Sequence, residues 1–278
     1  MTHLLGRILI SLFACGINLS VGAVSAWQPF EWVSARLFGQ TEPHAAILLR
    51  IPYQGKTCLV QLDTGFHGIT SGSSPAHLRE AVDQWFDGAE TGPIGEHMRC
   101  GSLGAGYFAG STLAIDFKAQ RLRRIGQTSA ISSPAGEPLK LITVPDWDGF
   151  FPVVEVEFPP LGRIPVMIDT GAAAFGVALF EESDWQVITA QTSIATDTAA
   201  RGQTRAQCQS TVESQPVSIG TQLSRELHLS HCIAADFKPP AGVRGVLGMK
   251  AFESDVLYLD FVKGQWHVSA SDQSAPVL

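Results

Sequence analysis

The tripeptide Asp-Thr-Gly occurs twice in this chain of 278 residues, at residues 63–65 and 169–171. Each copy follows an apolar run, which is typical of a buried strand that ends in a tight turn. Glycine lets such a turn approach a neighbouring backbone closely, and backbone N–H groups can then hold the carboxylate. One such turn is an ordinary surface feature. Two copies related by a pseudo-two-fold axis can place their carboxylates face to face across one cleft.

The chemistry open to such a pair is acid–base catalysis by coupled carboxyl groups. Like charges about 3 Å apart cannot both ionise cheaply, so Asp63 and Asp169 would share a proton and titrate as a unit. The ionised member can take a proton from a water molecule held between them, while the protonated member donates a hydrogen bond to a substrate carbonyl. The pattern predicts hydrolysis of an amide bond without a metal ion or other cofactor.

Internal similarity extends beyond the two triplets. Residues 46–63 and 152–169 each read as two strands joined by a Gly- or Pro-bearing turn, and both end at the aspartate. Residues 101–122 recur as residues 245–266 at a fixed offset of 144 positions. The matching positions are Gly101, Leu103, Gly104, Phe108, Leu113, Asp116 and Phe117, which correspond to Gly245, Leu247, Gly248, Phe252, Leu257, Asp260 and Phe261. A period of about half the chain indicates a duplicated unit rather than a solenoid.

The two halves differ between the aspartate turn and the glycine motif that comes after it. In the first half 41 positions separate them, and the pattern predicts a helix over residues 74–86, with Ser74 as its N-cap. In the second half 79 positions separate them, and residues 192–213 read as a hairpin. The residues at the expected turn of this hairpin are Ala200, Arg201, Gly202 and Gln203.

These motifs resemble those of the aspartic proteases, both pepsin-like and retropepsin-like. The resemblance rests on the two triplets and on the apolar-apolar-Gly motif after each, imperfect at residues 102–104 and well matched at residues 246–248. It covers about residues 46–268, and the second half looks most like a single retropepsin-type subunit. It implies an all-β chain of two closed-barrel lobes with a few short helices, an active site between the lobes and a hairpin flap.

Carried over to this sequence, the resemblance implies a role for each residue of the triplets. Asp63 and Asp169 would be the catalytic pair of an aspartic-type endopeptidase that cleaves peptide or protein substrates. The residues that would brace and shape the two turns are Thr64, Gly65, Thr170 and Gly171. The tip of the flap would be formed by Ala200, Arg201, Gly202 and Gln203.

The sequence departs from the family pattern in two places. Phe66 comes after the first triplet where the family usually has serine or alanine, whereas Ala172 in the second half fits. The first half is also short for a flap, so the flap would lie on the C-terminal lobe, whereas pepsins carry theirs on the N-terminal lobe. Two alternatives stay open: a retropepsin-like homodimer that uses only Asp169, and a peptide-binding or scaffolding protein that has lost turnover.

Other residues with functional side chains are better explained by the fold. Residues 104–110 read Gly-Ala-Gly-Tyr-Phe-Ala-Gly, but the strand and helix of a dinucleotide loop are missing around them. Asp116 and Asp260 lie within expected strands and read as structural hydrogen-bonding groups. His67 reads as a surface residue or as a neighbour of the site, and the histidines lack metal-ligand spacing.

Composition narrows the class of protein. The chain is 45% apolar and 16% charged, which is typical of a globular protein. Lys plus Arg is 19 and Asp plus Glu is 26, so the formal charge of −7 argues against a nucleic-acid partner. The 27 glycines and 16 prolines indicate many turns and short strands. We expect a monomer that acts on peptides.

Residues 1–26 read as an export signal. They hold one basic residue, an uncharged and mostly apolar run, and small residues before the expected cleavage point. If retained, the same run is long enough to tether the chain to a membrane, and Cys15 lies in a sequence that resembles a lipoprotein cleavage box. In each case the rest of the chain would be periplasmic or secreted.

Four cysteines remain after the signal, which is an even number for an oxidising compartment. Three connectivities are open, and so are buried free thiols. We favour one bridge in each half, which gives the pairs Cys58–Cys100 and Cys208–Cys232.

A segment rich in turn-forming residues separates the halves. With it, the expected organisation of the chain is complete. The segments are a signal or membrane anchor (1–26), an N-terminal extension (27–43), an N-terminal lobe (44–127), a linker with one short strand (128–148), a C-terminal lobe (149–270) and a tail (271–278).

Overall fold

The computed structural model describes residues 26–37, 40–71, 75–88, 97–127, 136–143, 149–190, 192–201, 204–233 and 238–271. Within these ranges the chain forms 21 strands, two α-helices and three short 3-10 helices, so the expected all-β class is confirmed. The predicted signal lies outside the described residues, apart from Ala26. The helices of the described part are all too short or too polar to cross a bilayer.

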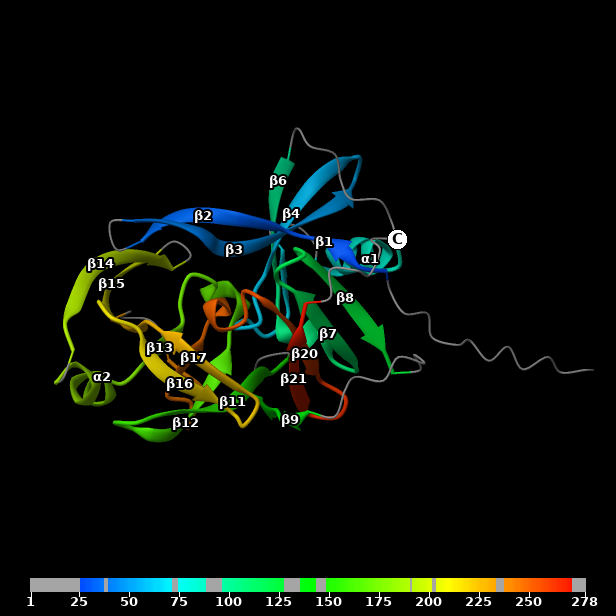
Figure 1. Ribbon diagram of the computed structural model, residues 1–278. Helices are drawn as coiled ribbons and strands as arrows, with labels where there is room; N and C mark the ends of the chain where they lie inside the picture. The colour runs from blue at the N-terminus through cyan, green and yellow to red at the C-terminus, as the bar shows by residue number, and fades with distance from the viewer. Residues whose placement is uncertain are drawn as a thin grey trace, which may run out of the picture.

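The first half forms a sheet of five strands in the order β2-β3-β4-β6-β5 (Figure 1). Its elements are β2 (Glu31–Leu37), β3 (Gln40–Tyr53), β4 (Lys56–Leu62), β5 (Ile69–Ser71), α1 (Pro75–Phe86), β6 (His97–Leu103) and η1 (Ala105–Phe108). Helix α1 confirms the predicted helix, and its buried face consists of Leu78, Val82, Trp85 and Phe86. The predicted N-cap, Ser74, lies outside the described residues.

The second half forms a larger sheet in the order β14-β15-β18-β13-β19-β12-β11-β16-β17, with β10 also paired to β11. Its elements are β10 (Lys140–Ile142), β11 (Phe151–Phe158), β12 (Gly162–Ile168), η2 (Thr170–Ala172), β13 (Val177–Leu179), α2 (Glu182–Thr189), β14 (Ile194–Arg201), β15 (Thr204–Thr211), β16 (Gln215–Ile219), β17 (Leu223–Leu227), β18 (Leu229–Ile233), β19 (Gly245–Leu247) and η3 (Met249–Ala251). The series β11-β12-β19-β13 repeats the series β3-β4-β6-β5, including the parallel pairing of its central strands.

A third sheet joins the halves, in the order β1-β8-β7-β20-β21-β9. Its strands are β1 (Gln28–Pro29), β7 (Ser111–Asp116), β8 (Arg121–Gly126), β9 (Glu137–Pro138), β20 (Asp255–Asp260) and β21 (Gln265–Ala270). At its centre β7 pairs with its own copy β20, and Ala114 lies opposite Tyr258. These two positions are related by the offset of 144 seen in the sequence, because 258 − 114 = 144. A pseudo-two-fold axis therefore passes between the halves at this pair.

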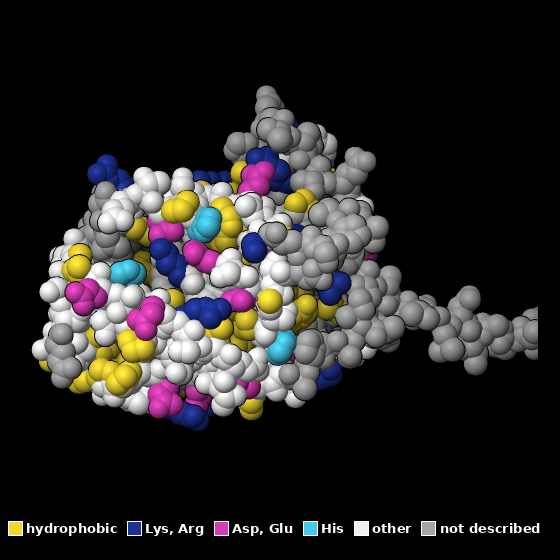
Figure 2. Space-filling model, viewed as in Figure 1, with side chains coloured by type: hydrophobic (Ala, Val, Ile, Leu, Met, Phe, Trp, Pro, Cys, Tyr) yellow, Lys and Arg dark blue, Asp and Glu magenta, His cyan; other side chains and the backbone are white. Residues whose placement is uncertain are grey.

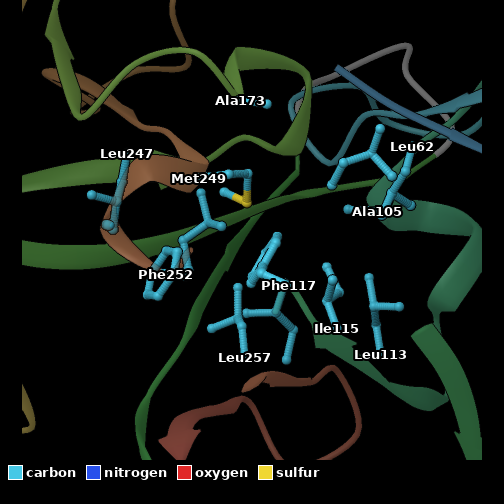
Figure 3. Close-up of a cluster of buried hydrophobic side chains, with 14 of the residues drawn as sticks. Leu62, Ala105, Leu113, Ile115, Phe117, Ala173, Leu247, Met249, Phe252 and Leu257 are labelled. Carbon is cyan, nitrogen blue, oxygen red and sulfur yellow. The ribbon is translucent and has the colours of Figure 1, made fainter. Parts of the chain in front are cut away.

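The prediction of two closed barrels is wrong. In the part of the chain that the structure describes, all three sheets are open, because β7 and β20, which could close each half, pair with each other instead. Pairing of β7 with β20 satisfies both strand edges without closure. The hydrophobic core is also shared, because one cluster of buried side chains runs through both halves (Figure 3). Labelled members such as Leu62 and Ile115 come from the first half, and Leu247 and Phe252 from the second.

The structure also shows a repeat that the sequence analysis missed. Strand β1 lies in the segment interpreted as an extension, and β9 in the segment interpreted as a linker, yet they occupy equivalent edges of the shared sheet. Just after them, Phe30 N donates to Gln120 O at 2.9 Å, and Leu139 N donates to Gly264 O at 2.8 Å. Gln120 and Gly264 are again 144 positions apart. The boundaries drawn at residues 43 and 148 stay predictions.

Both predicted disulfides are present. Cys58–Cys100 joins β4 to β6, and Cys208–Cys232 joins β15 to β18. Each half therefore carries one covalent cross-link between strands that are distant in sequence. Paired cysteines are consistent with the oxidising compartment that the sequence predicts.

Candidate active site

The two aspartates occupy equivalent turns at the ends of equivalent strands. Asp63 comes directly after β4, and its backbone N–H donates to Leu103 O at 3.0 Å. Asp169 comes directly after β12, and its backbone N–H donates to Leu247 O at 3.0 Å. The acceptors belong to β6 and β19, the strands that run parallel to β4 and β12. The same backbone frame therefore positions both carboxyl groups.

The two threonines tie the turns to each other. Thr64 N donates to Thr170 Oγ1 at 2.9 Å, and Thr170 N donates to Thr64 Oγ1 at 3.0 Å. The Thr64 hydroxyl in turn donates to Ile168 O at 2.8 Å. Both threonines are fully buried, so water cannot replace these bonds. The exchange is reciprocal, as the pseudo-two-fold axis requires, and it fixes the distance between the turns.

Each carboxyl group lies against the glycine of the opposite turn. Gly65 N donates to Asp169 Oδ1 at 3.1 Å, and Gly171 N donates to the same oxygen at 2.7 Å. A Cβ atom on Gly65 would lie 2.3 Å from Asp169 Cγ, and one on Gly171 would lie 2.6 Å from Asp63 Cγ. Only glycine fits at either position. The structure thus brings all six residues of the two triplets together.

The side chains at the centre of the site are partly exposed. Asp63, Asp169 and Phe66 are all half-buried. The Phe66 ring meets the His67 ring edge-on, with ring centres 4.3 Å apart. His67 is held through its carbonyl oxygen, which accepts a hydrogen bond from Gly106 N at 2.8 Å.

The two turns differ in length. Gly104 N donates to Gly68 O at 2.6 Å, and Gly248 N donates to Gly176 O at 2.8 Å, so Gly68 and Gly176 are equivalent. From aspartate to this glycine the chain advances five residues in the first turn (63 to 68) and seven in the second (169 to 176). The first turn therefore has two residues fewer in which to present side chains to the site.

The glycine of each apolar-apolar-Gly motif lies where the chain crosses the backbone of an aspartate turn. A Cβ atom on Gly104 would lie 2.3 Å from Phe66 O, and one on Gly248 would lie 2.3 Å from Ala172 O. The backbones touch where the chain passes over each aspartate turn, which excludes any side chain. The imperfect sequence motif at residues 102–104 therefore forms the same crossing as the better one.

A cluster of polar side chains supports the first turn from behind. The Tyr107 hydroxyl donates to Asp83 at 2.6 Å and accepts from Arg124 Nη1 at 2.8 Å. Burial is the main reason that the pKa of Tyr107 is raised above its usual value, so the hydroxyl stays protonated. These contacts fasten η1 to α1, and η1 carries the backbone that holds Phe66 and His67. Sequence reasoning missed this cluster, since its members are far apart in the chain.

The predicted hairpin is present. Strands β14 and β15 pair from Ile194 opposite Thr211 to Arg201 opposite Thr204. Of the predicted flap tip, Gly202 and Gln203 lie outside the described residues, and Ala200 and Arg201 are described only as strand backbone. Helix α2, which precedes the hairpin, was not predicted.

The aspartates of the repeated strands have structural contacts. Buried Asp116 accepts hydrogen bonds from Ala119 N at 3.1 Å and from Ser271 Oγ at 2.7 Å. Asp260 accepts from Val262 N at 3.0 Å and from a second backbone N–H of the same turn. They hold the turns after β7 and β20, as expected. Among the described residues we find no group of three or more His, Cys, Asp or Glu arranged to hold a metal ion.

Comparison with known proteins found a distant similarity in structure and no match in sequence. No protein-family model matches the chain, and no curated protein sequence matches it. Among solved structures it is similar to the aspartic proteinase from Irpex lacteus, at 11% identity and a TM-score of 0.34. The match covers 60% of this chain and 58% of the fungal chain, which is less than two thirds of that protein. At this level we draw nothing from it about activity.

Proposed function

We propose that the protein is an aspartic-type endopeptidase in which Asp63 and Asp169 share a proton and activate one water molecule. The observation that carries the proposal is that each carboxyl group lies on the glycine of the opposite turn. Two half-buried carboxyl groups held this way favour a state with a single negative charge. That state supplies a base and an acid at once.

The reaction needs nothing but these two groups and water. The ionised carboxylate takes a proton from the water, whose oxygen bonds to the substrate carbonyl carbon while the other carboxyl group protonates the carbonyl oxygen. The carboxyl group that was the acid is now ionised, and it takes one hydroxyl proton from the gem-diol as the C–N bond breaks. The carboxyl group that took the proton from water gives it to the nitrogen of the leaving amine, which restores the starting state of the pair. A doubly ionised pair has no acid, and a doubly protonated pair has no base. Activity should therefore fall both above and below an optimum pH.

The remaining parts of the proposal depend on the same site. The hairpin β14–β15 would be the flap, with residues 200–203 at its tip, and the substrate would be a peptide or unfolded protein. The chain would act as a monomer, because the two turns meet within one chain. It would be exported, to the periplasm or beyond, with or without a membrane tether. Basic and acidic side chains are interspersed on the face in Figure 2, which supports a peptide rather than a nucleic acid as partner.

The test is to change each aspartate separately. We expect Asp63→Asn and Asp169→Asn each to lower the hydrolysis of a denatured protein substrate by about a thousandfold, the scale of acid–base catalysis. Asp87→Asn is the matched control, because Asp87 is an exposed aspartate just after α1. Thermal unfolding of all three variants checks that the fold is kept.

Two outcomes would replace the proposal with its alternatives. Full activity of Asp63→Asn would indicate a homodimer that uses two copies of Asp169. If the unchanged chain binds peptides but does not cleave them at any pH, it is a binding protein. Phe66 and the shorter first turn are the features that favour this second alternative. Binding of a statine-type transition-state mimic separates the classes, since an enzyme binds it far more tightly than substrate.

A further inference from the structure

The outer part of the β2–β3 hairpin has no counterpart in the second half among the described residues. We call residues 34–37 and 40–44 the arm. Beyond an irregularity after Val33, the arm pairs Ala35 with Glu42 and Leu37 with Gln40. The equivalent strands β10 and β11 pair over only three positions. Within the described ranges the arm is thus seen only in the first half, and it extends toward the second (Figure 1).

One ion pair and one histidine–carboxylate contact fix the arm to the second half. Lys250 Nζ lies 2.5 Å from Glu42 Oε2, and the two side chains are only 31% and 16% exposed. His44 Nδ1 lies 3.3 Å from Glu253 Oε1. Both partners belong to the segment directly after the second glycine motif, on η3 or just beyond it. The arm is thus tied to the segment that also fixes the Asp169 turn.

Leu37, at the outer end of the described part of the arm, contacts the hairpin β14–β15. It packs against buried Cys208, and so does Phe175. Phe175 belongs to the Asp169 turn, and its carbonyl oxygen accepts from Lys250 N. Cys208 lies on β15, the inner strand of the hairpin, while β14 is at the edge of its sheet and lies beside β2. Cys208 therefore joins the aspartate turn, the hairpin and the arm, because Phe175 and Leu37 both pack against it.

We propose that the arm is a strap that holds the hairpin β14–β15 against the Asp169 turn and limits how fast substrate reaches the aspartates. The inference rests on the proposed function, because it concerns the hairpin as the flap of that site. Within the described part of the chain the hairpin is otherwise held by its pairing with β18 and by Trp185 Nε1 of α2, which donates to Gln209 Oε1 at 2.6 Å. To move away from the arm, β14 must leave β2, and Cys208 of β15 must leave Leu37.

Two variants release the strap at different points. Leu37→Ser removes the apolar contact at the tip, and Lys250→Gln removes the ion pair at the base while leaving the fold of η3 intact. Arg163→Gln is the matched control, because Arg163 forms an exposed ion pair with Glu157 in the same half, in the β11–β12 hairpin. Thermal unfolding of each variant shows whether its global stability is kept.

The first measurement is amide hydrogen exchange of residues 194–211 in the full chain. We expect exchange there to rise about tenfold in Leu37→Ser and less in Lys250→Gln, with no change in Arg163→Gln. The second measurement is the association rate of a statine-type mimic, which should rise severalfold in the same order. We expect neither variant to change the hydrolytic step itself, because neither residue belongs to the two triplets.

The outcomes separate the strap from the proposed function. Unchanged exchange in both variants would overturn the strap alone, and so would a slower association in Leu37→Ser, since the arm would then be part of the groove. If exchange rises but no variant binds the mimic, the endopeptidase assignment fails and the gating role of the strap fails with it.

Discussion

The two aspartate turns are alike where they contact each other and different in the residues that come after each triplet. They share the backbone bonds to β6 and β19, the reciprocal threonine bonds and the close contact of glycine with carboxyl group. They differ in length by two residues and in the side chain after the triplet, which is Phe66 in one and Ala172 in the other. The two turns have thus kept the contacts that they make with each other, while the neighbouring positions have come to differ in length and in side chain.

The halves also differ in the elements that come after each turn. The first half continues into α1 and then, after ten residues, into β6, whereas the second half inserts β14 to β18 between α2 and β19. The first half carries the arm instead, and the arm contacts the inserted hairpin. The two halves have therefore become complementary: one supplies the hairpin and the other the contact that restrains it.

The equality of the turns is tested most strongly at their glycines. Gly65→Ala and Gly171→Ala each place a methyl group within 2.6 Å of the opposite carboxyl carbon, so the carboxyl groups must shift. A displacement of about 1 Å at reacting groups can cost about a hundredfold in rate, and we expect at least that loss from both variants. Hydrolysis of a denatured protein at the optimum pH measures it. Gly126→Ala is the control, because nothing lies within 4 Å of its Cβ position. A loss in only one of the two would show that the turns are not equivalent.

Removing each disulfide in turn compares how much one cross-link stabilises each half. Their sequence separations are 42 for Cys58–Cys100 and 24 for Cys208–Cys232. Loop-closure entropy predicts about 4 kcal/mol for the first and about 3.5 kcal/mol for the second, so their double Cys→Ser variants should lose similar amounts. Urea unfolding monitored by fluorescence measures both. A much smaller loss for the 208–232 pair would indicate that the hairpin base unfolds locally before the rest of the molecule.

The threonines test the symmetry at a smaller scale. Thr64→Val and Thr170→Val keep the shape of the side chain but leave a buried N–H of the opposite turn without its acceptor. We expect each to lower the free energy of unfolding by about 2 kcal/mol. The matched Ser variants keep the hydroxyl and should lose less. If the two Val variants differ by more than about 1 kcal/mol, the exchange is not energetically reciprocal.

Much of this comparison could be predicted from the sequence, because the features concerned depend on residues that are close together in the chain. The triplets, the glycine motifs and helix α1 carry short-range signals, namely turn residues at fixed spacing and apolar residues at helical spacing. The sharing of one sheet could not be predicted, because the alternation of residues 111–116 suits closure within a half as well as pairing with a copy. The repeat of β1 as β9 was also hidden, since each strand has only two residues.

The arm shows the same limit for the candidate site. The contact of β2 with β14 joins residues more than 150 positions apart, and the ion pair between Glu42 and Lys250 spans 208 positions. One sequence holds no signal for such contacts. The pairing of Cys208 with Cys232 could be predicted only because cysteine has so few partners to choose from. Contacts of ordinary side chains offer no such restriction.

Phe66 gives the smallest expected effect and the sharpest distinction between the turns. The ring is half-buried and packs on His67, so Phe66→Ala should change the free energy of unfolding by about 1 kcal/mol or less. If the ring contacts substrate, KM should rise severalfold for peptides with a large apolar residue near the cleaved bond, while kcat stays nearly constant. Ala172→Ser in the equivalent position is the comparison, and it should alter neither constant. A large rise in kcat in Phe66→Ala would instead mean that the aromatic ring restrains Asp63. The ring would then lower turnover, as the peptide-binding alternative requires.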